Sequence, residues 1–191
     1  MTATYALRLR HVPNLISALR IVLVAPLLAA IATRRDEMAL VIAVVAGVSD
    51  GLDGYLARRF HWQSRLGSIL DPAADKLMLV GAMLVLGLVQ AVPMWLVVLV
   101  VARDAVIAGG AVAWYAVFRR FEAHPSWISK LTTVVQIGYV LLVLASHALA
   151  VWVPLAIAGW IVAVLTPVSG LDYVLRWGRL AWRGLKTGRP A

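Results

Sequence analysis

The apolar run ALVIAVVAGVS (residues 39–49) leads directly into DGLDGYLARRFHWQSRLGSILDPAAD (residues 50–75), and this junction decides the fold. The first run suits the interior of a lipid bilayer. The second holds four of the nine acidic residues of the chain, namely Asp50, Asp53, Asp71 and Asp75. Carboxylates inside a membrane are costly and are rarely kept for stability. Their gathering here therefore points to a functional site.

The composition around this junction is that of an integral membrane protein. Of the 191 residues, 62% are hydrophobic and only 14% are charged, whereas a soluble domain of this length needs far more polar surface. The absence of cysteine excludes disulfides, thiolate metal sites and a cysteine nucleophile. The net charge of +9 is carried at the ends of apolar segments, which suits anionic lipid headgroups better than nucleic acid.

Six apolar runs are long enough to cross a bilayer as helices. They lie near residues 13–33, 38–58, 67–89, 92–118, 127–149 and 152–175. We therefore predict an all-α integral membrane protein with six transmembrane helices, built as one domain over residues 1–191. Within it, residues 13–175 form the core, residues 1–12 a short interfacial helix or a frayed terminus, and residues 176–191 a basic cytoplasmic tail.

The positions of the basic residues predict the orientation in the membrane. The loops after the third and fifth spans have no Lys or Arg, whereas those after the second and fourth have Arg59, Arg65, Arg119 and Arg120. This positive-inside pattern predicts a multi-pass protein of a bacterial-type inner membrane with both termini cytoplasmic. The loop TRRDE (residues 33–37) is the exception, because its two arginines would face outward.

The spacing of the four aspartates predicts that they meet. Asp50 and Asp53 are three residues apart on the second span, and Asp71 and Asp75 are four apart on the third, so each pair shares one helix face. The intervening polar run RRFHWQSRL (residues 58–66) is expected to form the cytoplasmic turn. The result is a helical hairpin with four carboxylates near the cytoplasmic interface.

Four carboxylates this close repel one another unless cations compensate them. All-oxygen ligation suits Mg²⁺ or Mn²⁺, and magnesium keeps positions open for phosphate oxygens. Two metals would stabilise the attacking and leaving oxygens in a displacement at phosphorus. The alternative is a buried salt-bridge network of the aspartates with Arg58, Arg65 and Lys76.

Small residues lie on the same helix faces as the aspartates. Gly54, Ala57 and Gly67 would let a ligand approach the backbone closely; the alternative is that they allow close helix packing. We assign Arg58, one turn after Gly54, to the ligand.

At these residues the sequence resembles the signature of the CDP-alcohol phosphotransferases, DxxDGxxARx8GxxxDxxxD. Every specified position matches, from Asp50 to Asp75. The run PNLISALR (residues 13–20) is similar to the first helix of that family, and the resemblance covers residues 12–175.

The resemblance implies a six-helix membrane enzyme, usually a homodimer, with its active site at the cytoplasmic face. Such an enzyme transfers a substituted phosphate from a CDP-linked donor, here CDP-diacylglycerol, to an alcohol and releases CMP. By the same resemblance Asp50, Asp53 and Asp71 would bind metal. Asp75 would be the general base and also touch a second metal. The CDP-binding residues would be Gly54, Ala57, Arg58 and Gly67.

Two polar stretches in apolar spans bear on the acceptor. ARDAVIAGG (residues 102–110) and SWISKLTTVVQ (residues 126–136) look most like the CMP-forming cardiolipin synthases, whose acceptor is phosphatidylglycerol. By resemblance Arg103 and Lys130 would bind the acceptor phosphate. The alternatives are a self-neutralising pair for Arg103 with Asp104 and a snorkelling anchor for Lys130.

The second possibility within the family is a phosphatidylglycerophosphate synthase, whose acceptor is glycerol 3-phosphate. Those enzymes usually have a further arginine where this chain has Ala111. Fewer cations for a phosphate dianion favour the phosphodiester acceptor.

A reading from a different class is an ion or proton transporter, which would spread its acids across several helices. Here the acids concentrate on one hairpin, with Arg20 and Asp172 as exceptions. These two either pair with each other or contact substrate, and Arg20 could alternatively reach the nucleotide.

Overall fold

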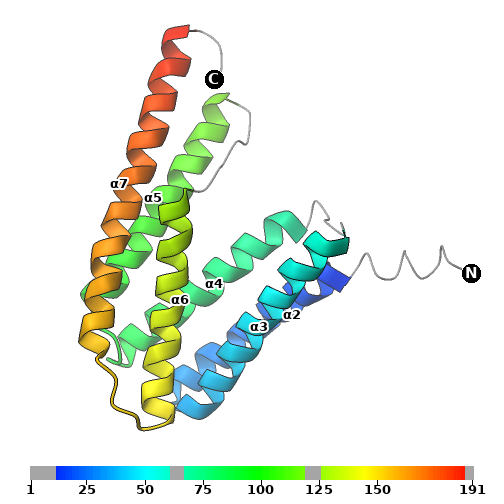
Figure 1. Cartoon of the computed structure of the whole chain (residues 1–191), viewed down its shortest axis with the longest axis vertical. Coiled ribbons are helices and arrows are strands. Elements are labelled where there is room, and N and C mark those ends of the chain that lie inside the picture. Colours follow the sequence, from blue (N-terminus) through cyan, green and yellow to red (C-terminus); the bar gives the residue numbers. More distant parts are fainter. Residues whose placement is uncertain (1–11, 61–66, 119–125, 188–191) are drawn as a thin grey trace, which may run out of the picture. The chain divides into compact units, whose positions relative to one another are not determined.

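The computed structural model describes residues 12–60, 67–118 and 126–187, and within these ranges the chain is all-helical (Figure 1). The predicted interfacial segment, residues 1–12, lies outside this description except for its last residue. The six helices are α2 (Val12–Ala32), α3 (Asp36–Phe60), α4 (Gly67–Leu88), α5 (Met94–Phe118), α6 (Trp127–Ala148) and α7 (Leu155–Thr187). They coincide with the six apolar runs, which confirms the all-α class.

Prolines fix the start of two helices. Pro93 and Pro154 directly precede α5 and α7, and their carbonyls accept hydrogen bonds from the N–H groups of Leu96 (3.0 Å) and Ile157 (3.1 Å). Proline needs no hydrogen bond from its own nitrogen there. Both helices therefore begin slightly later than the apolar runs predict.

The last helix continues beyond the predicted span. The hydropathy of the sequence ends the sixth run at residue 175, but α7 extends through Thr187 into the basic segment. Hydropathy marks where a helix leaves the apolar layer, whereas the backbone hydrogen bonds continue through Arg and Leu, which favour helices.

Three helices end on residues in the left-handed region. Arg34, Gln90 and Ala150 have φ of 56°, 59° and 50° and follow α2, α4 and α6. At the first two, the paired bonds Arg34 N–H to Ile31 O (3.1 Å) and Arg35 N–H to Ala30 O (2.9 Å), and their counterparts after α4, satisfy the last carbonyls. The chain thus reverses direction in tight turns after these helices, although non-glycine residues occupy the left-handed positions.

Three of the described helical segments are long and apolar enough to cross a membrane: Met94–Trp114, Trp127–Ala148 and Leu155–Arg179. In α2 the apolar stretch Arg20–Ala32 is shorter. Large apolar side chains are exposed on these segments, among them Trp127 and Trp160, which fits a surface covered by lipid. The structure is thus that of a membrane protein, while the number of spans remains a prediction.

The chain divides into two compact units. The first comprises residues 1–92 and 140–153, and the second residues 93–139 and 154–191. In the first unit α2 packs against both α3 and α4. Its buried side chains include Leu27 and Ile31 of α2 and Met83 of α4. The two helices α2 and α4 approach closely at Gly81, where an added Cβ would lie 3.2 Å from the Leu28 Cδ atoms.

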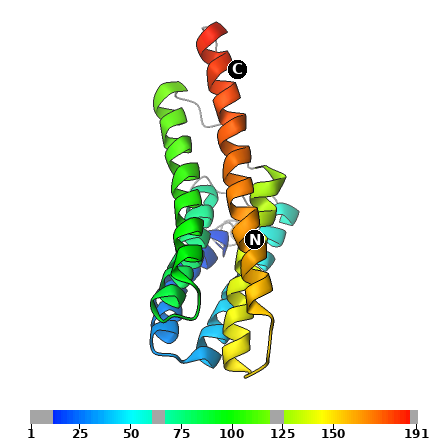
Figure 2. The same cartoon turned by 90° about the vertical axis from the view of Figure 1, so that its left-hand side faces the viewer.

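In the second unit α5 and α7 run side by side (Figures 1 and 2). Rings join them at two levels, with Trp95 and Trp160 centroids 5.6 Å apart and Trp114 and Trp177 centroids 4.7 Å apart. Between these levels Gly110 faces Tyr173, and a Cβ there would come within 2.9 Å of the tyrosine ring.

Candidate functional site

The predicted carboxylate site falls on two consecutive helices of the first unit. Asp50 and Asp53 lie in the second half of α3, and Asp71 and Asp75 in the first turns of α4. The helical spacing assumed for each pair is therefore confirmed at the level of the backbone. The predicted nucleotide-binding residues lie on the same helices, with Gly54, Ala57 and Arg58 on α3 and Gly67 as the first residue of α4. Of these eight residues, only Asp75 has a described side chain.

The chemistry of this donor set fits a divalent cation. Four carboxylates supply only hard oxygen donors, which Mg²⁺ and Mn²⁺ prefer, and the chain has no thiol that would favour a softer metal. Among the described side chains no three His, Asp or Glu residues gather into a metal site. The side chains of Asp50, Asp53 and Asp71 lie outside the described ones, so the metal site stays a prediction from the sequence.

The structure gives Asp75 a partner that the sequence analysis did not foresee. A terminal nitrogen of the Arg20 guanidinium, on α2, donates to Asp75 Oδ1 and forms an ion pair with it. Arg20 is 55 residues away in sequence and reaches Asp75 because α2 packs against α4. Helix α2 therefore also contributes a residue, Arg20, next to the predicted carboxylate site on α3 and α4.

The sequence left open whether Arg20 and Asp172 pair with each other or contact substrate, and the structure gives each of them a partner on a helix of its own unit. Asp172 accepts from Arg176 Nε at 2.7 Å, one turn further along α7. Arg20 is buried in the run LISALRIVLV (residues 15–24), where an isolated charge is costly. That position signalled the need for a carboxylate partner, but only the packing of α2 selects which aspartate supplies it.

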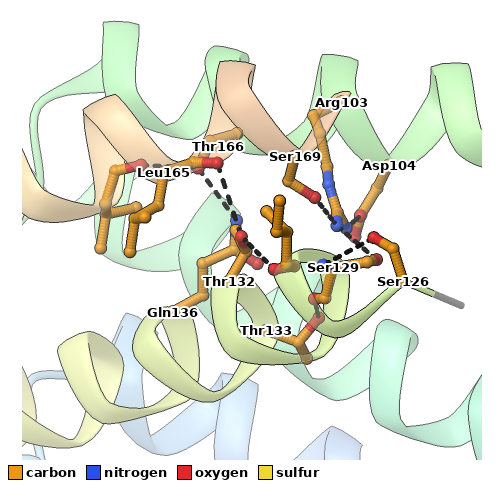
Figure 3. A network of polar contacts seen from close by, with 12 residues as sticks. Arg103, Asp104, Ser126, Ser129, Thr132, Thr133, Gln136, Leu165, Thr166 and Ser169 are labelled. Carbon is orange, nitrogen blue, oxygen red and sulfur yellow. Dashed lines mark hydrogen bonds and ion pairs between the residues drawn. The ribbon is translucent and has the colours of Figure 1, made fainter. Parts of the chain in front are cut away.

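A second polar cluster lies in the second unit, where α5, α6 and α7 meet (Figure 3). Arg103 of α5 is buried there. Its NH1 group donates to Asp104 Oδ1 at 2.6 Å, and its NH2 group to Ser129 Oγ at 2.7 Å and Ser169 Oγ at 2.6 Å. The self-neutralising pair of Arg103 with Asp104, which the sequence left as an alternative, is therefore present. The Nε group of Arg103 is buried without a hydrogen-bond partner among the described residues.

Hydroxyl and amide groups extend this cluster along α6 and α7. Gln136 Nε2 donates to Thr166 Oγ1 at 3.1 Å, and the Thr166 hydroxyl donates to the Val162 carbonyl at 2.7 Å. The Thr132 hydroxyl donates to the Ile128 carbonyl at 2.8 Å. In the described part of the chain Gln136 Oε1 also has no partner. Among the described residues, one buried donor of the cluster, Arg103 Nε, and one buried acceptor, Gln136 Oε1, thus have no hydrogen-bond partner.

Lys130 differs from Arg103 in its surroundings. Its side chain is exposed at the start of α6, and its ammonium lies 5.4 Å from the centre of the Trp127 ring. Ser126 caps this helix start, accepting from the Ser129 N–H at 3.1 Å. This placement suits an anchor at a membrane surface, and it also leaves the ammonium accessible to a phosphate.

Sequence reasoning missed the serines of the second cluster. Ser129 lies within the stretch SWISKLTTVVQ (residues 126–136), and Ser169 lies in an apolar span. No sequence signal marks them, because serines are common in membrane helices and their role depends on Arg103 reaching across from α5.

Comparison with known proteins bears on both clusters. The profile described as CDP-alcohol phosphatidyltransferase matches residues 10–168, which includes all eight signature positions, Arg103 and Lys130. A CDP-diacylglycerol–glycerol-3-phosphate 3-phosphatidyltransferase of Pseudomonas fluorescens is 34% identical over 187 residues, or 93% of each chain.

Relatives named as cardiolipin synthases match over shorter stretches. A Mycobacterium tuberculosis protein, provisionally named a cardiolipin synthase, is 40% identical over 103 residues, which cover 53% of this chain. The match spans about half the length of that relative, 49%. A cardiolipin synthase (CMP-forming) of Streptomyces coelicolor is 43% identical over 72 residues, 38% of this chain and 34% of its own.

Proposed function

Because the chain belongs to the CDP-alcohol phosphatidyltransferase family, we propose that it transfers a phosphatidyl group from CDP-diacylglycerol to a glycerol-type acceptor. The acceptor hydroxyl oxygen attacks the phosphorus that bears the diacylglycerol. The bond from that phosphorus to the bridging oxygen breaks, and CMP leaves with the electron pair. The observation that supports this most is the placement of all eight signature positions on α3 and α4, with Asp75 partly exposed at its side chain.

In this proposal the signature residues of the first unit have three roles: metal binding, nucleotide binding and general base catalysis. Two Mg²⁺ or Mn²⁺ ions per site would be held by the four aspartates, Asp50, Asp53, Asp71 and Asp75. When bound, these cations would neutralise the charge of the diphosphate. Gly54, Ala57, Arg58 and Gly67 would line the cytidine diphosphate. Asp75 would accept the proton of the acceptor hydroxyl as general base. Its partly exposed carboxylate fits this role, since a base must be reachable by its substrate.

For the acceptor we propose phosphatidylglycerol, bound by Arg103 and Lys130. Arg103 is already neutralised by Asp104, and its buried Nε–H donor has no partner in the part of the chain that the structure describes. A site with little uncompensated positive charge suits a phosphodiester monoanion better than a phosphate dianion. The product would then be cardiolipin.

A second acceptor, glycerol 3-phosphate, is favoured by one observation. The relative that matches along 93% of both chains is named for that acceptor, whereas those named for cardiolipin synthesis match along about half or less. The transporter alternative has no comparable support, because the matching family is one of enzymes.

The setting of the enzyme follows the same reasoning. We propose six membrane-spanning helices with both termini and the carboxylate site at the cytoplasmic face, as the distribution of basic residues predicts. We further propose a single catalytic domain and a homodimer in a bacterial inner membrane.

An acceptor panel tests the proposal. Purified protein in detergent receives CDP-diacylglycerol and Mg²⁺ or Mn²⁺ with phosphatidylglycerol, glycerol 3-phosphate, serine or inositol phosphate, and CMP and lipid products are identified by mass spectrometry. Cardiolipin formed from phosphatidylglycerol supports the proposal. Phosphatidylglycerophosphate formed from glycerol 3-phosphate would show that glycerol 3-phosphate, and not phosphatidylglycerol, is the acceptor. The absence of CMP with every acceptor, from folded protein, overturns the activity.

A further inference from the structure

The ion pair between Arg20 and Asp75 is uneven in its exposure to solvent. The side chain of Arg20 is 3% exposed, whereas that of Asp75 is 42% exposed. A guanidinium stays charged in proteins, and a buried one cannot leave its counter-ion without a large penalty. Arg20 is therefore a fixed cation within the helix packing, and Asp75 is the member that a ligand can reach.

In the proposed reaction Asp75 has two further roles: it binds metal, and it accepts the proton of the acceptor hydroxyl. A fixed positive charge beside Asp75 makes the carboxylate group of α3 and α4 one unit less negative toward an incoming cation. It also holds Asp75 Oδ1 in one direction through a charge-assisted hydrogen bond. Charge and geometry thus act on the same carboxylate from a residue outside the signature.

We infer that Arg20 is a positioning residue that restrains Asp75 from full capture by divalent metal and keeps it directed toward the acceptor. This inference rests on the proposed function. It has a distinctive consequence: loss of the Arg20 charge strengthens metal binding and slows turnover. General structural damage would weaken both.

The test measures Mn²⁺ binding to the full chain in detergent micelles, without nucleotide, by electron paramagnetic resonance. For Arg20→Gln we expect Mn²⁺ to bind on the order of tenfold more tightly, because one opposing charge is removed. Under the acceptor panel the same variant is expected to lose about tenfold or more in kcat, with a smaller change in the KM for CDP-diacylglycerol.

Two further variants separate charge, position and folding. Arg20→Lys keeps a cation in the buried position but lacks the planar fork, so Mn²⁺ affinity should stay within about twofold of wild type while kcat falls. Arg34→Gln is the charge-matched control: Arg34 is exposed, bonds to the Val89 carbonyl, and lies in the turn after α2, about 18 Å of helix beyond Arg20. Its Mn²⁺ affinity should not change.

Unchanged or weaker Mn²⁺ binding by folded Arg20→Gln protein overturns the inference. If that variant does not fold, Arg20→Lys decides: unchanged affinity with lower kcat supports the inference, and altered affinity or wild-type kcat overturns it. The proposed function fails separately, when wild-type protein that binds Mn²⁺ releases no CMP with any acceptor.

Discussion

Arg103 is paired with its own neighbour in sequence, Asp104, at 2.6 Å inside the second unit. Both side chains are nearly buried, with 4% and 10% exposed. Adjacent residues on a helix point in different directions, so this pair needs the long arginine side chain to turn back. The serines of α6 and α7 then bind the remaining face of the guanidinium. The pair is thus the centre that ties three helices together.

Breaking this pair should cost stability. In Asp104→Asn the buried guanidinium loses its counter-charge but keeps an oxygen acceptor, so we expect a loss of about 2–3 kcal/mol. Thermal unfolding in detergent measures it. The matched control is Asp172→Asn, whose partner Arg176 is 59% exposed; there the loss should be about 0.5 kcal/mol. Equal losses in the two variants would contradict a central role for Arg103 with Asp104.

Arg103→Lys probes the acceptor role. A lysine has no planar fork, so it cannot bond to Asp104, Ser129 and Ser169 and still offer a further N–H donor to the acceptor, as the Nε group of the arginine would. We expect the KM for the acceptor to rise about tenfold, which corresponds to roughly 1.4 kcal/mol of acceptor binding. The KM for CDP-diacylglycerol should change by less than about twofold. Arg176→Lys, at an exposed pair on α7, is the control and should leave both constants unchanged. A variant in which only the donor KM rises would assign Arg103 to the donor instead.

Asp75→Asn tests the proposed base. The substitution keeps the shape of the side chain and a hydrogen-bond acceptor for Arg20 but removes its counter-charge, so the protein should fold with reduced stability. Turnover should fall by about 10²–10⁴-fold, the usual contribution of a general base. Glu37→Asn, at the exposed first turn of α3, controls for loss of an acidic charge in the same unit. CMP release near the wild-type rate from Asp75→Asn would remove Asp75 from the reaction.

Two adjacent glycines of α5 provide a matched test of packing. A Cβ at Gly110 would lie 2.9 Å from Tyr173 Cε1, whereas one at Gly109 would meet nothing within 4 Å. We expect Gly110→Ala to lower stability by about 1 kcal/mol because the ring must shift against Trp177. Gly109→Ala should be neutral or raise stability by up to about 1 kcal/mol through helix propensity. The melting temperatures of the two variants in detergent should therefore move apart; a common shift would contradict the packing of α5 on α7.

The sequence predicted the helices well because each depends on local information. Runs of about 20 apolar residues, prolines at positions 93 and 154, and short polar loops are all readable without knowing what packs where. The prediction was less successful at the end of α7, where the helix outlasts its apolar stretch. It left the acceptor open, because the cardiolipin and glycerol-phosphate readings differ in only a few side chains.

What the sequence determined by itself is the family and the set of eight signature positions, because fixed spacing on helices α3 and α4 encodes both. Only the tertiary structure decided the partners of the buried charges. Arg20 pairs with Asp75 and Asp172 with Arg176, and Arg103 contacts Ser129 and Ser169 on two other helices. The physical reason is that a buried charge must find compensation, while the identity of its partner depends on which helices pack together.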